Sequence, residues 1–244
     1  MNILSWNING FTKANLSTIS DIVSRAEYDL ILFQETKSSN VPLPLTLSSY
    51  KTINFPSKKP NYSGTLIATK EPPLSILRGI GNEEFDKDGR LITLEFDRFY
   101  VLNAYFPFAG DFLAKLESKL NFLREFERHC RELSTKKPLI ICGDFNIAHQ
   151  DIDRTFGDEG MPGFSLKERE WLSAFLKSGF TDSFRFLHKG VRKYSGIWYN
   201  DKSKADRLDY CLLSNELVSL LRGSDILDKV EGSDHMPIVV ELRF

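Results

Sequence analysis

Short apolar runs recur along the chain, and most of them end in a polar residue, which predicts a protein built largely of β-strands. The runs have the length of strands rather than of helices, and several are bounded by Gly, Asn, Asp or Pro. The expected strands cover residues 2–8, 29–35, 64–70, 89–96, 99–106, 138–146, 207–214 and 236–244.

Apolar residues at helical spacing predict helices over residues 16–26, over about residues 111–133, and after Ser165. Ser165 and Glu168 form a capping-box pattern, and Gly179 is placed to end that helix. Strands with only occasional helices between them favour mixed sheets over a series of βαβ units. We therefore expect an α/β fold in which two mixed β-sheets pack face to face, with helices outside.

Composition allows a large core and excludes some classes of protein. The chain has 244 residues, 41% of them hydrophobic, 19 phenylalanines and a net charge of -1, so it is not a generally basic protein. Three cysteines without paired spacing argue against a disulfide framework, and no apolar run is long enough to span a membrane. The first ten residues do not resemble a signal peptide. We expect a reduced, soluble, intracellular (cytoplasmic) protein.

Polar residues stand at the ends of six expected strands. Asp144 and Asn146 close the run "PLIICGDFN", and side-chain alternation would place them on one face of the strand. The other strand ends carry the same feature at Asn7 and Asn9, Gln34 and Glu35, Asn103 and Tyr105, Asp209, and Asp234 and His235.

Each of these residues has an ordinary structural explanation. Gly143, Asp144 and Asn146 are turn formers, Asp209 could pair with Arg207, and a buried tyrosine usually only donates a hydrogen bond. Six strand ends with the same feature favour chemistry, because a sheet core is destabilised by each unpaired carboxylate that approaches it.

The set of side chains favours a hard metal ion over a covalent nucleophile. Carboxylate and amide oxygens such as those of Glu35, Asp234 and Asn7 suit Mg²⁺ or Mn²⁺, whereas zinc prefers several His or Cys. A carboxylate-bound Mg²⁺ beside a histidine is suited to hydrolysis of a phosphodiester.

Eight motifs in one order resemble the exonuclease III and apurinic/apyrimidinic (AP) endonuclease family of the endonuclease/exonuclease/phosphatase superfamily. They are "SWNING", "LFQETK", "YSGTLIATK", "GIGNEEFDKDGRLITLEF", "NAYFP", "CGDFNIAH", "RLDYCLLS" and "GSDHMPI". The resemblance implies a single domain over residues 1–244 with a four-layered α/β sandwich. It also implies Mg²⁺-dependent hydrolysis of DNA phosphodiesters that leaves a 3′-hydroxyl.

The resemblance implies roles at matching positions. Asp144 resembles the carboxylate that deprotonates or orients the attacking water, and Asn146 would hold a phosphate oxygen. His235 would contact the phosphate or act as acid or base, Asp209 would orient His235, and Tyr105 would lie beside the phosphate or the leaving group. The division of roles among Asp144, His235 and Tyr105 stays open. The expected metal ligands are Asn7, Glu35, Asp144, Asn146, Asp234 and His235.

Double-stranded DNA with abasic sites or 3′ ends is the expected partner of a monomer, and contact with it requires a local basic patch. Residues 185–207 contain seven Lys or Arg against two Asp, with Tyr194, Trp198 and Tyr199 interleaved. The alternative is a solvated loop. Lys58 and Lys59 are weaker candidates for phosphate contact. The expected substrate-binding residues are Asn9, Asn103, Arg90, Lys193, Trp198 and Arg207.

The chain departs from the AP endonuclease pattern around the expected sugar pocket. Phe108 stands in place of Asn, Gly196 and Ile197 in place of aromatic residues, and Asp206 in place of Trp. Segments 153–163 and 200–206 also look short. We expect Asp206 to repel DNA phosphates, and abasic-site incision to dominate less over 3′-end trimming than in typical relatives.

Two other functions remain open. One is a phosphoesterase of the same superfamily that acts on RNA, a phosphoinositide or another phosphoester. The motifs "GIGNEEFDKDGR" and "RLDY" favour DNA over these substrates. The other is a DNA-binding module that does not catalyse a reaction. The complete set of polar residues at the strand ends argues against this function.

Overall fold

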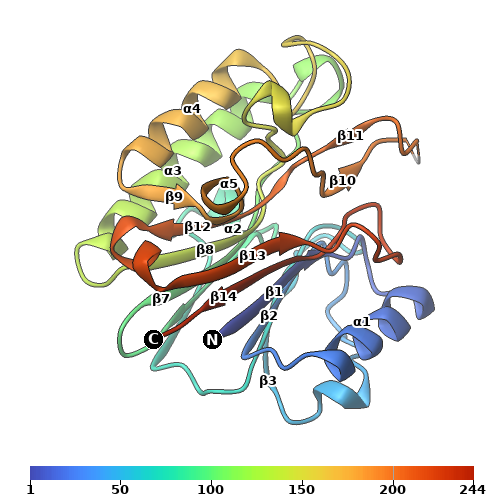
Figure 1. The fold of residues 1–244 in the computed structure, drawn as a ribbon, viewed down its shortest axis with the longest axis vertical. Helices are drawn as coiled ribbons and strands as arrows, with labels where there is room; N and C mark the ends of the chain where they lie inside the picture. Colours follow the sequence, from blue (N-terminus) through green and yellow to red (C-terminus); the bar gives the residue numbers. More distant parts are fainter. Residues whose placement is uncertain (200) are drawn as a thin grey trace.

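Two six-stranded mixed sheets pack face to face, with helices on both outer faces (Figure 1). The computed structural model describes residues 1–199 and 201–244. The first sheet has the order β13-β14-β1-β2-β4-β3 and the second has the order β5-β6-β7-β8-β12-β9. This arrangement confirms the α/β sandwich expected from the sequence.

The strands of the first sheet come from both ends of the chain. They are β1 (Asn2–Asn7), β2 (Leu30–Gln34), β3 (Lys51–Phe55), β4 (Thr65–Thr69), β13 (Leu221–Ile226) and β14 (Ile238–Leu242). The second sheet is built from the middle of the chain. Its strands are β5 (Ser75–Arg78), β6 (Leu91–Glu95), β7 (Tyr100–Tyr105), β8 (Leu139–Asp144), β9 (Phe180–Asp182) and β12 (Asp209–Ser214).

Helices cover the outer faces of both sheets. Helix α1 lies against the first sheet, and α3 and α4 lie against the second (Figure 1). A two-stranded ribbon of β10 (Gly196–Ile197) and β11 (Ala205–Asp206) stands apart from both sheets. The α-helices are α1 (Lys13–Arg25), α2 (Glu83–Asp86), α3 (Leu116–Ser134), α4 (Leu166–Lys177) and α5 (Ser183–Leu187).

Burial of alternate strand residues explains the layers. In β8, Ile140 and Cys142 face the core between the sheets, while Leu139 and Ile141 face the core under α3 and α4. Because both faces are covered, every residue of β8 is buried, which explains its continuous apolar run. The three cysteines are buried and free, as expected for small hydrophobic residues.

One parallel pair of strands lies at the centre of each sheet. Strand β1 pairs in parallel with β2, and β7 pairs in parallel with β8. The carboxyl ends of a parallel pair meet at one edge of its sheet, so Asn7 lies beside Gln34 and Tyr105 beside Asp144. Antiparallel β12 enters at the same edge, since Asp209 lies opposite Asp144. The strand register alone therefore brings the polar residues at these strand ends close together.

The eight expected strands are confirmed, with ends within three residues. The three expected helices are also confirmed, although α3 begins at Leu116, five residues later than expected from 111. The ribbon strands β10 and β11 were missed, and so were β3, β5, β9 and β13. These last four are the edge strands of the two sheets and are at least partly open to solvent, so they lack a continuous apolar run. Among the described helices, none combines the length with the apolar character that a membrane span needs.

Candidate active site

The side chains at the ends of β1, β2 and β8 form one hydrogen-bonded cluster. The amide of Asn7 donates to Glu35 Oε1 at 3.0 Å and to Asp144 Oδ2 at 2.9 Å, which joins the two sheets. Asn7 is fully buried, and its Oδ1 accepts the backbone N–H of Asn9 at 3.0 Å. The cluster that the sequence predicted from separate strands is therefore continuous.

Asn146 lies beyond the end of β8 in the left-handed region, with φ 51°. The expectation that Asp144 and Asn146 share a strand face is therefore wrong, because the backbone turns after Asp144. Asp144 Oδ1 accepts the backbone N–H of Asn146 at 2.8 Å, and Asp144 Oδ2 accepts from its side-chain amide at 3.2 Å. The turn itself thus brings the two side chains together.

Close packing of β7 and β8 holds this strand end in place. Gly143 precedes Asp144, and an added Cβ there would lie 1.9 Å from the carbonyl oxygen of Ala104. Only glycine allows the two strands to approach at this point.

His235 is anchored from three sides. Its Nδ1 lies 2.8 Å from Asp209 Oδ2, its Nε2 lies 3.9 Å from Asp144 Oδ2, and its backbone carbonyl accepts from the indole of Trp6 at 2.8 Å. The pairing of His235 with Asp209 is the one expected from the sequence, and it fixes the orientation of the ring.

Burial and neighbouring charges shift the pKa values of Asp144 and His235 toward neutrality or above. Burial, with the negative charges of Asp209 and Glu35, raises the pKa of Asp144 to about 7, although His235 opposes this. Burial alone would lower the pKa of His235, but Asp209 and Asp144 raise it well above its ordinary value. At neutral pH these shifts favour the imidazolium form of His235 and let Asp144 exchange a proton.

Glu35 is also left-handed, with φ 50°, which is uncommon for glutamate and marks a constrained position. Burial would raise its pKa, but Lys37 and the Asn7 hydrogen bond lower it below its ordinary value. Lys37 Nζ lies 2.9 Å from Glu35 Oε2 and also contacts Asn9 Oδ1. Sequence reasoning missed Lys37, although its place two residues after Glu35 in "QETK" was a signal.

Tyr105 remains a neutral phenol at the site. Burial and the charges of Glu35 and Asp144 raise its pKa well above its ordinary value. The guanidinium of Arg90 lies 5.0 Å from the centre of the Tyr105 ring and binds Asp88 and the hydroxyl of Tyr62. Arg90 is nearly buried but lines a cavity of about 280 Å³ together with Tyr105 and Phe108, so its expected contact with substrate stays a prediction.

A cavity of about 320 Å³ opens over this cluster. Its lining residues are Asn9, Glu35, Tyr105, Phe108, Asn146, Gly196, Ile197, Trp198, Leu208, Asp234 and His235. Asn9 donates to Asp234 at 3.1 Å across its mouth. Among the described residues, Asp144, Asp209 and His235 also bring ligand atoms within 4.8 Å of one another. Oxygen donors predominate, which fits a hard divalent cation.

Aromatic rings form the apolar side of this cavity. Phe108 lies 5.8 Å from Trp198 between ring centres, and Phe156 lies 6.2 Å from it. At position 196, an added Cβ would lie 2.9 Å from a terminal methyl of Leu208, so a larger side chain there would require Leu208 to shift. Phe108 and Trp198 therefore supply the rings that Gly196 does not.

The expected repulsion between Asp206 and DNA is wrong. Asp206 is fully buried, pairs with Arg154 at 3.4 Å, and accepts the indole N–H of Trp198 at 2.8 Å. The carboxylate faces into the protein and holds Trp198 rather than facing the cavity.

Five of the seven basic residues in 185–207 form ion pairs with acids, although the pairs of Lys202 and Lys204 are exposed. Arg185 and Arg207 bind Asp153, and Arg207 also binds Asp182. Because Arg207 is fully buried, its expected contact with substrate is corrected. The local excess of positive charge that the sequence suggested is therefore much smaller at the surface.

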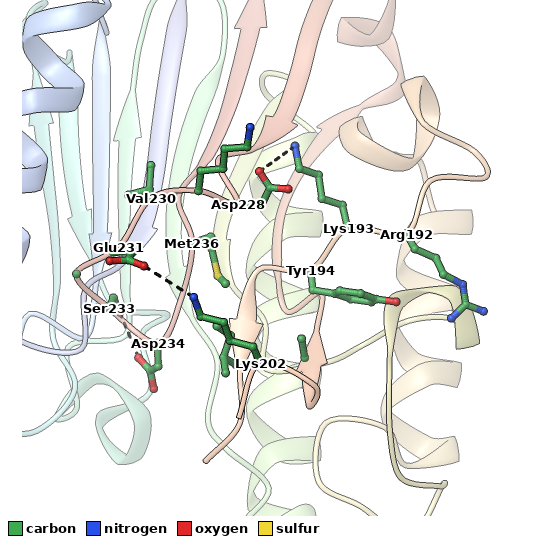
Figure 2. Close-up of a pocket in the computed structure, with 14 residues that line it drawn as sticks. Arg192, Lys193, Tyr194, Lys202, Asp228, Val230, Glu231, Ser233, Asp234 and Met236 are labelled. Carbon is green, nitrogen blue, oxygen red and sulfur yellow. Dashed lines mark hydrogen bonds and ion pairs between the residues drawn. The ribbon is translucent and has the colours of Figure 1, made fainter. Parts of the chain in front are cut away.

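A wide groove of about 880 Å³ lies beside Asp234, between residues 192–205 and 228–236 (Figure 2). Figure 2 shows Lys193 facing Asp228 and Lys202 facing Glu231, at 3.8 Å in both pairs. Lys193 also binds Asp225 at 2.7 Å, so its charge is shared with two acids.

Asn103 does not reach the cavity. It is fully buried between the sheets, donates to the carbonyls of Phe33 and Leu66, and accepts from Gln34 at 2.7 Å. The prediction that Asn103 contacts substrate is therefore corrected, because Asn103 instead links the two sheets.

An α/β sandwich with carboxylates, amides and a histidine at one edge of its sheets defines a metal-assisted phosphoesterase. Its family follows from sequence: the chain belongs to the Endonuclease/Exonuclease/phosphatase family, whose model matches residues 4–235.

Relatives place the chain in the exonuclease III and AP endonuclease branch, which confirms the resemblance. It is 37% identical to the DNA repair nuclease APEX1 of Danio rerio, covering 99% of this chain and 82% of that protein. It is 34% identical to an exodeoxyribonuclease of Bacillus subtilis, covering 98% of both. In fold, it matches the AP endonuclease of Leishmania major with a TM-score of 0.89 at 23% identity, over 100% of this chain and 87% of that one.

Proposed function

We propose that this protein is a metal-dependent DNA repair nuclease that incises at abasic sites and trims 3′ ends. One observation carries the proposal: Glu35, Asn7, Asp144, Asp209 and His235, from both sheets, are joined in one cluster beside the cavity. The names of the curated relatives support DNA as the substrate.

Glu35 and Asp234 would hold the metal ion, with Asn7 beside them, because their oxygens line or adjoin the cavity. The all-oxygen character of these ligands favours Mg²⁺, for which Mn²⁺ substitutes. When bound, such an ion supplies positive charge for the phosphate oxygens. The Lys37 ammonium now contacts one of these groups, Glu35, and also Asn9, so it would move aside or share Glu35 with the metal.

Asp144 is the proposed general base. Its pKa of about 7 lets it take a proton from water at neutral pH, while the Tyr105 phenol, with its raised pKa, is a donor and not a base. The water oxygen attacks phosphorus, the bond from phosphorus to the 3′-oxygen breaks, and that oxygen takes up a proton.

His235, held as a cation by Asp209, is the proposed partner of the negative charge that develops on the phosphate. The two amide hydrogens of Asn146 already bind the carbonyl of Phe106 and Asp144 Oδ2, at 3.0 and 3.2 Å. The longer of these bonds would have to open before Asn146 could hold a phosphate oxygen.

The proposed substrate is double-stranded DNA, bound by a monomer whose residues 1–244 act as one nuclease domain. Phe108, Trp198 and Leu208 line the apolar side of the cavity, which suits a sugar that lacks its base. Asn9, Lys37 and Trp198 are the proposed contacts with this nucleotide.

Cleavage of a labelled duplex tests the proposal. One strand carries a single abasic site, a second duplex carries a recessed 3′ end, and both are incubated with Mg²⁺, with Mn²⁺ and with a chelator. We expect cleavage of both duplexes only with metal, and products that a polymerase can extend because they end in a 3′-hydroxyl. An RNA duplex and a phosphoinositide serve as competing substrates. Faster turnover of either, or binding of DNA without cleavage, would contradict the proposal.

A further inference from the structure

A fully buried ion pair joins the first turns of α3 and α4 outside the cavity. Lys119 Nζ lies 2.7 Å from Glu168 Oε1, and neither side chain is exposed. A second ion pair, Lys167 with Glu117 at 3.3 Å, joins the same two helices, but both of its side chains are well exposed.

Lys119 has a second partner in the active site. Its ammonium donates at 2.6 Å to the backbone carbonyl of Asn146, the left-handed residue that follows Asp144 by two positions. The donor groups of Asn146 are already engaged, since its backbone N–H and its amide bind Asp144 and its amide also binds the carbonyl of Phe106. Lys119 therefore holds the carbonyl side of the turn, which the residues at the strand ends do not contact.

Glu168 is held just as firmly. Its carboxylate accepts from the hydroxyl of Ser165 at 2.6 Å and from the backbone N–H groups of Ser165 and Gly163, each at 3.1 Å. An added Cβ at Gly163 would lie 3.0 Å from the carbonyl oxygen of Asn146, so this loop packs directly against the turn. Lys119, Glu168 and the turn thus form one interlocked unit.

Stability alone does not explain a buried pair at this place. Desolvation opposes such pairs, and apolar residues of similar volume often replace them without loss of stability. An apolar replacement, however, offers no donor to the carbonyl of Asn146. The distinctive contribution of Lys119 is that hydrogen bond.

We propose that Lys119, held by Glu168, is a positioning residue for catalysis. Through the carbonyl of Asn146 it fixes the turn whose N–H and amide orient the carboxylate of Asp144. This inference rests on the proposed nuclease function, because it assigns Lys119 an effect on the base of that reaction.

The test compares three variants with the wild type. Lys119→Met with Glu168→Gln removes both buried charges together, so that neither is left unpaired, while Lys119→Arg keeps the positive donor. Lys167→Met removes the exposed pair between the same helices and serves as the control. Each protein is checked by thermal unfolding, and kcat and KM are measured on the abasic duplex.

We expect the double variant to fold and to lose kcat by about 10- to 100-fold, as for a small misplacement of a reacting group, with little change in KM. Lys119→Arg should recover most of the loss, and Lys167→Met should match the wild type. In an Asp144→Asn background, the double variant should cost little further activity, because the base that Lys119 positions is already gone.

Three results would overturn the inference: a folded double variant with wild-type kcat, a loss confined to KM, or a full multiplicative loss in the Asp144→Asn background. Amide hydrogen exchange gives a readout that does not depend on cleavage. Exchange in residues 144–148 should accelerate in the double variant and not in Lys167→Met, and equal protection in both would contradict the inference. If the wild type itself fails to cleave DNA, the proposed function fails, and exchange still decides the role of Lys119.

Discussion

The polar cluster at the strand ends and the aromatic side of the cavity are adjacent, but they are built in different ways. Asn7, Tyr105 and Asp144 are placed by the register of paired strands, and the hydrogen bond from Asn7 to Asp144 joins the two sheets. Phe108 and Trp198 lie on connections between elements, and a buried carboxylate, Asp206, holds the indole of Trp198. We infer that the cluster determines the chemistry, whereas the aromatic side adjusts the choice of substrate.

Removal of the base should give the largest effect in this comparison. We expect Asp144→Asn to lower kcat by about 10³-fold, within the range for loss of a general base, without unfolding the protein. Glu35→Ala should cause a comparable loss through the metal. Asp151→Asn, on the exposed acid that binds Arg169 at 3.4 Å, is the control. Near-normal turnover by a folded Asp144→Asn protein would show that the cluster does not determine the chemistry.

Within the cluster, the residue that faces the phosphate should matter more than the one that orients it. We expect His235→Ala to lower kcat by about 10²-fold, and Asp209→Ala to lower it several-fold less, because the second variant keeps the imidazole. Single-turnover rates of the two purified variants decide the order. A greater loss from Asp209→Ala would reverse the assigned roles.

The pH profile should reflect the burial of Asp144. Since the base must be ionised, kcat/KM should fall as pH falls through about 7, by about tenfold per unit below the midpoint. A bound cation favours the carboxylate, so the midpoint with metal should lie at or below that value. A rate that is constant from neutral pH to pH 5 would contradict Asp144 as the base.

Changes on the aromatic side should be smaller and should alter selectivity rather than turnover. Loss of one stacking ring is worth about 1–3 kcal/mol, so Trp198→Ala should lower the ratio of abasic incision to 3′ trimming by about tenfold. Asp206→Asn keeps an acceptor for the indole and should change the ratio by less. The two rates are measured on one duplex. A fall in both rates together, with an unchanged ratio, would assign Trp198 to the chemistry instead.

The sequence predicted the central strands and the catalytic cluster because both depend on local pattern and strand register. Asp144 and His235 were identified from runs that end in polar residues, and the turn at Asn146 changes the geometry without separating them. The surroundings could not be predicted in this way. Asp206 and Arg207 are adjacent and both charged, and only their distant partners, Arg154 and Asp153, show that both are buried.

The pairing of β1 with β14 has a consequence for when the protein becomes active during its synthesis. Asn2 lies opposite Glu241, and the indole of Trp6 binds the carbonyl of His235, 229 residues further along the chain. During synthesis, β1 and β2 emerge early, while the strand that completes their sheet and carries His235 into place emerges late. Contacts of such long sequence separation also form slowly. A nascent chain would therefore remain inactive until β14 pairs with β1, so a partly synthesised nuclease would not cut DNA.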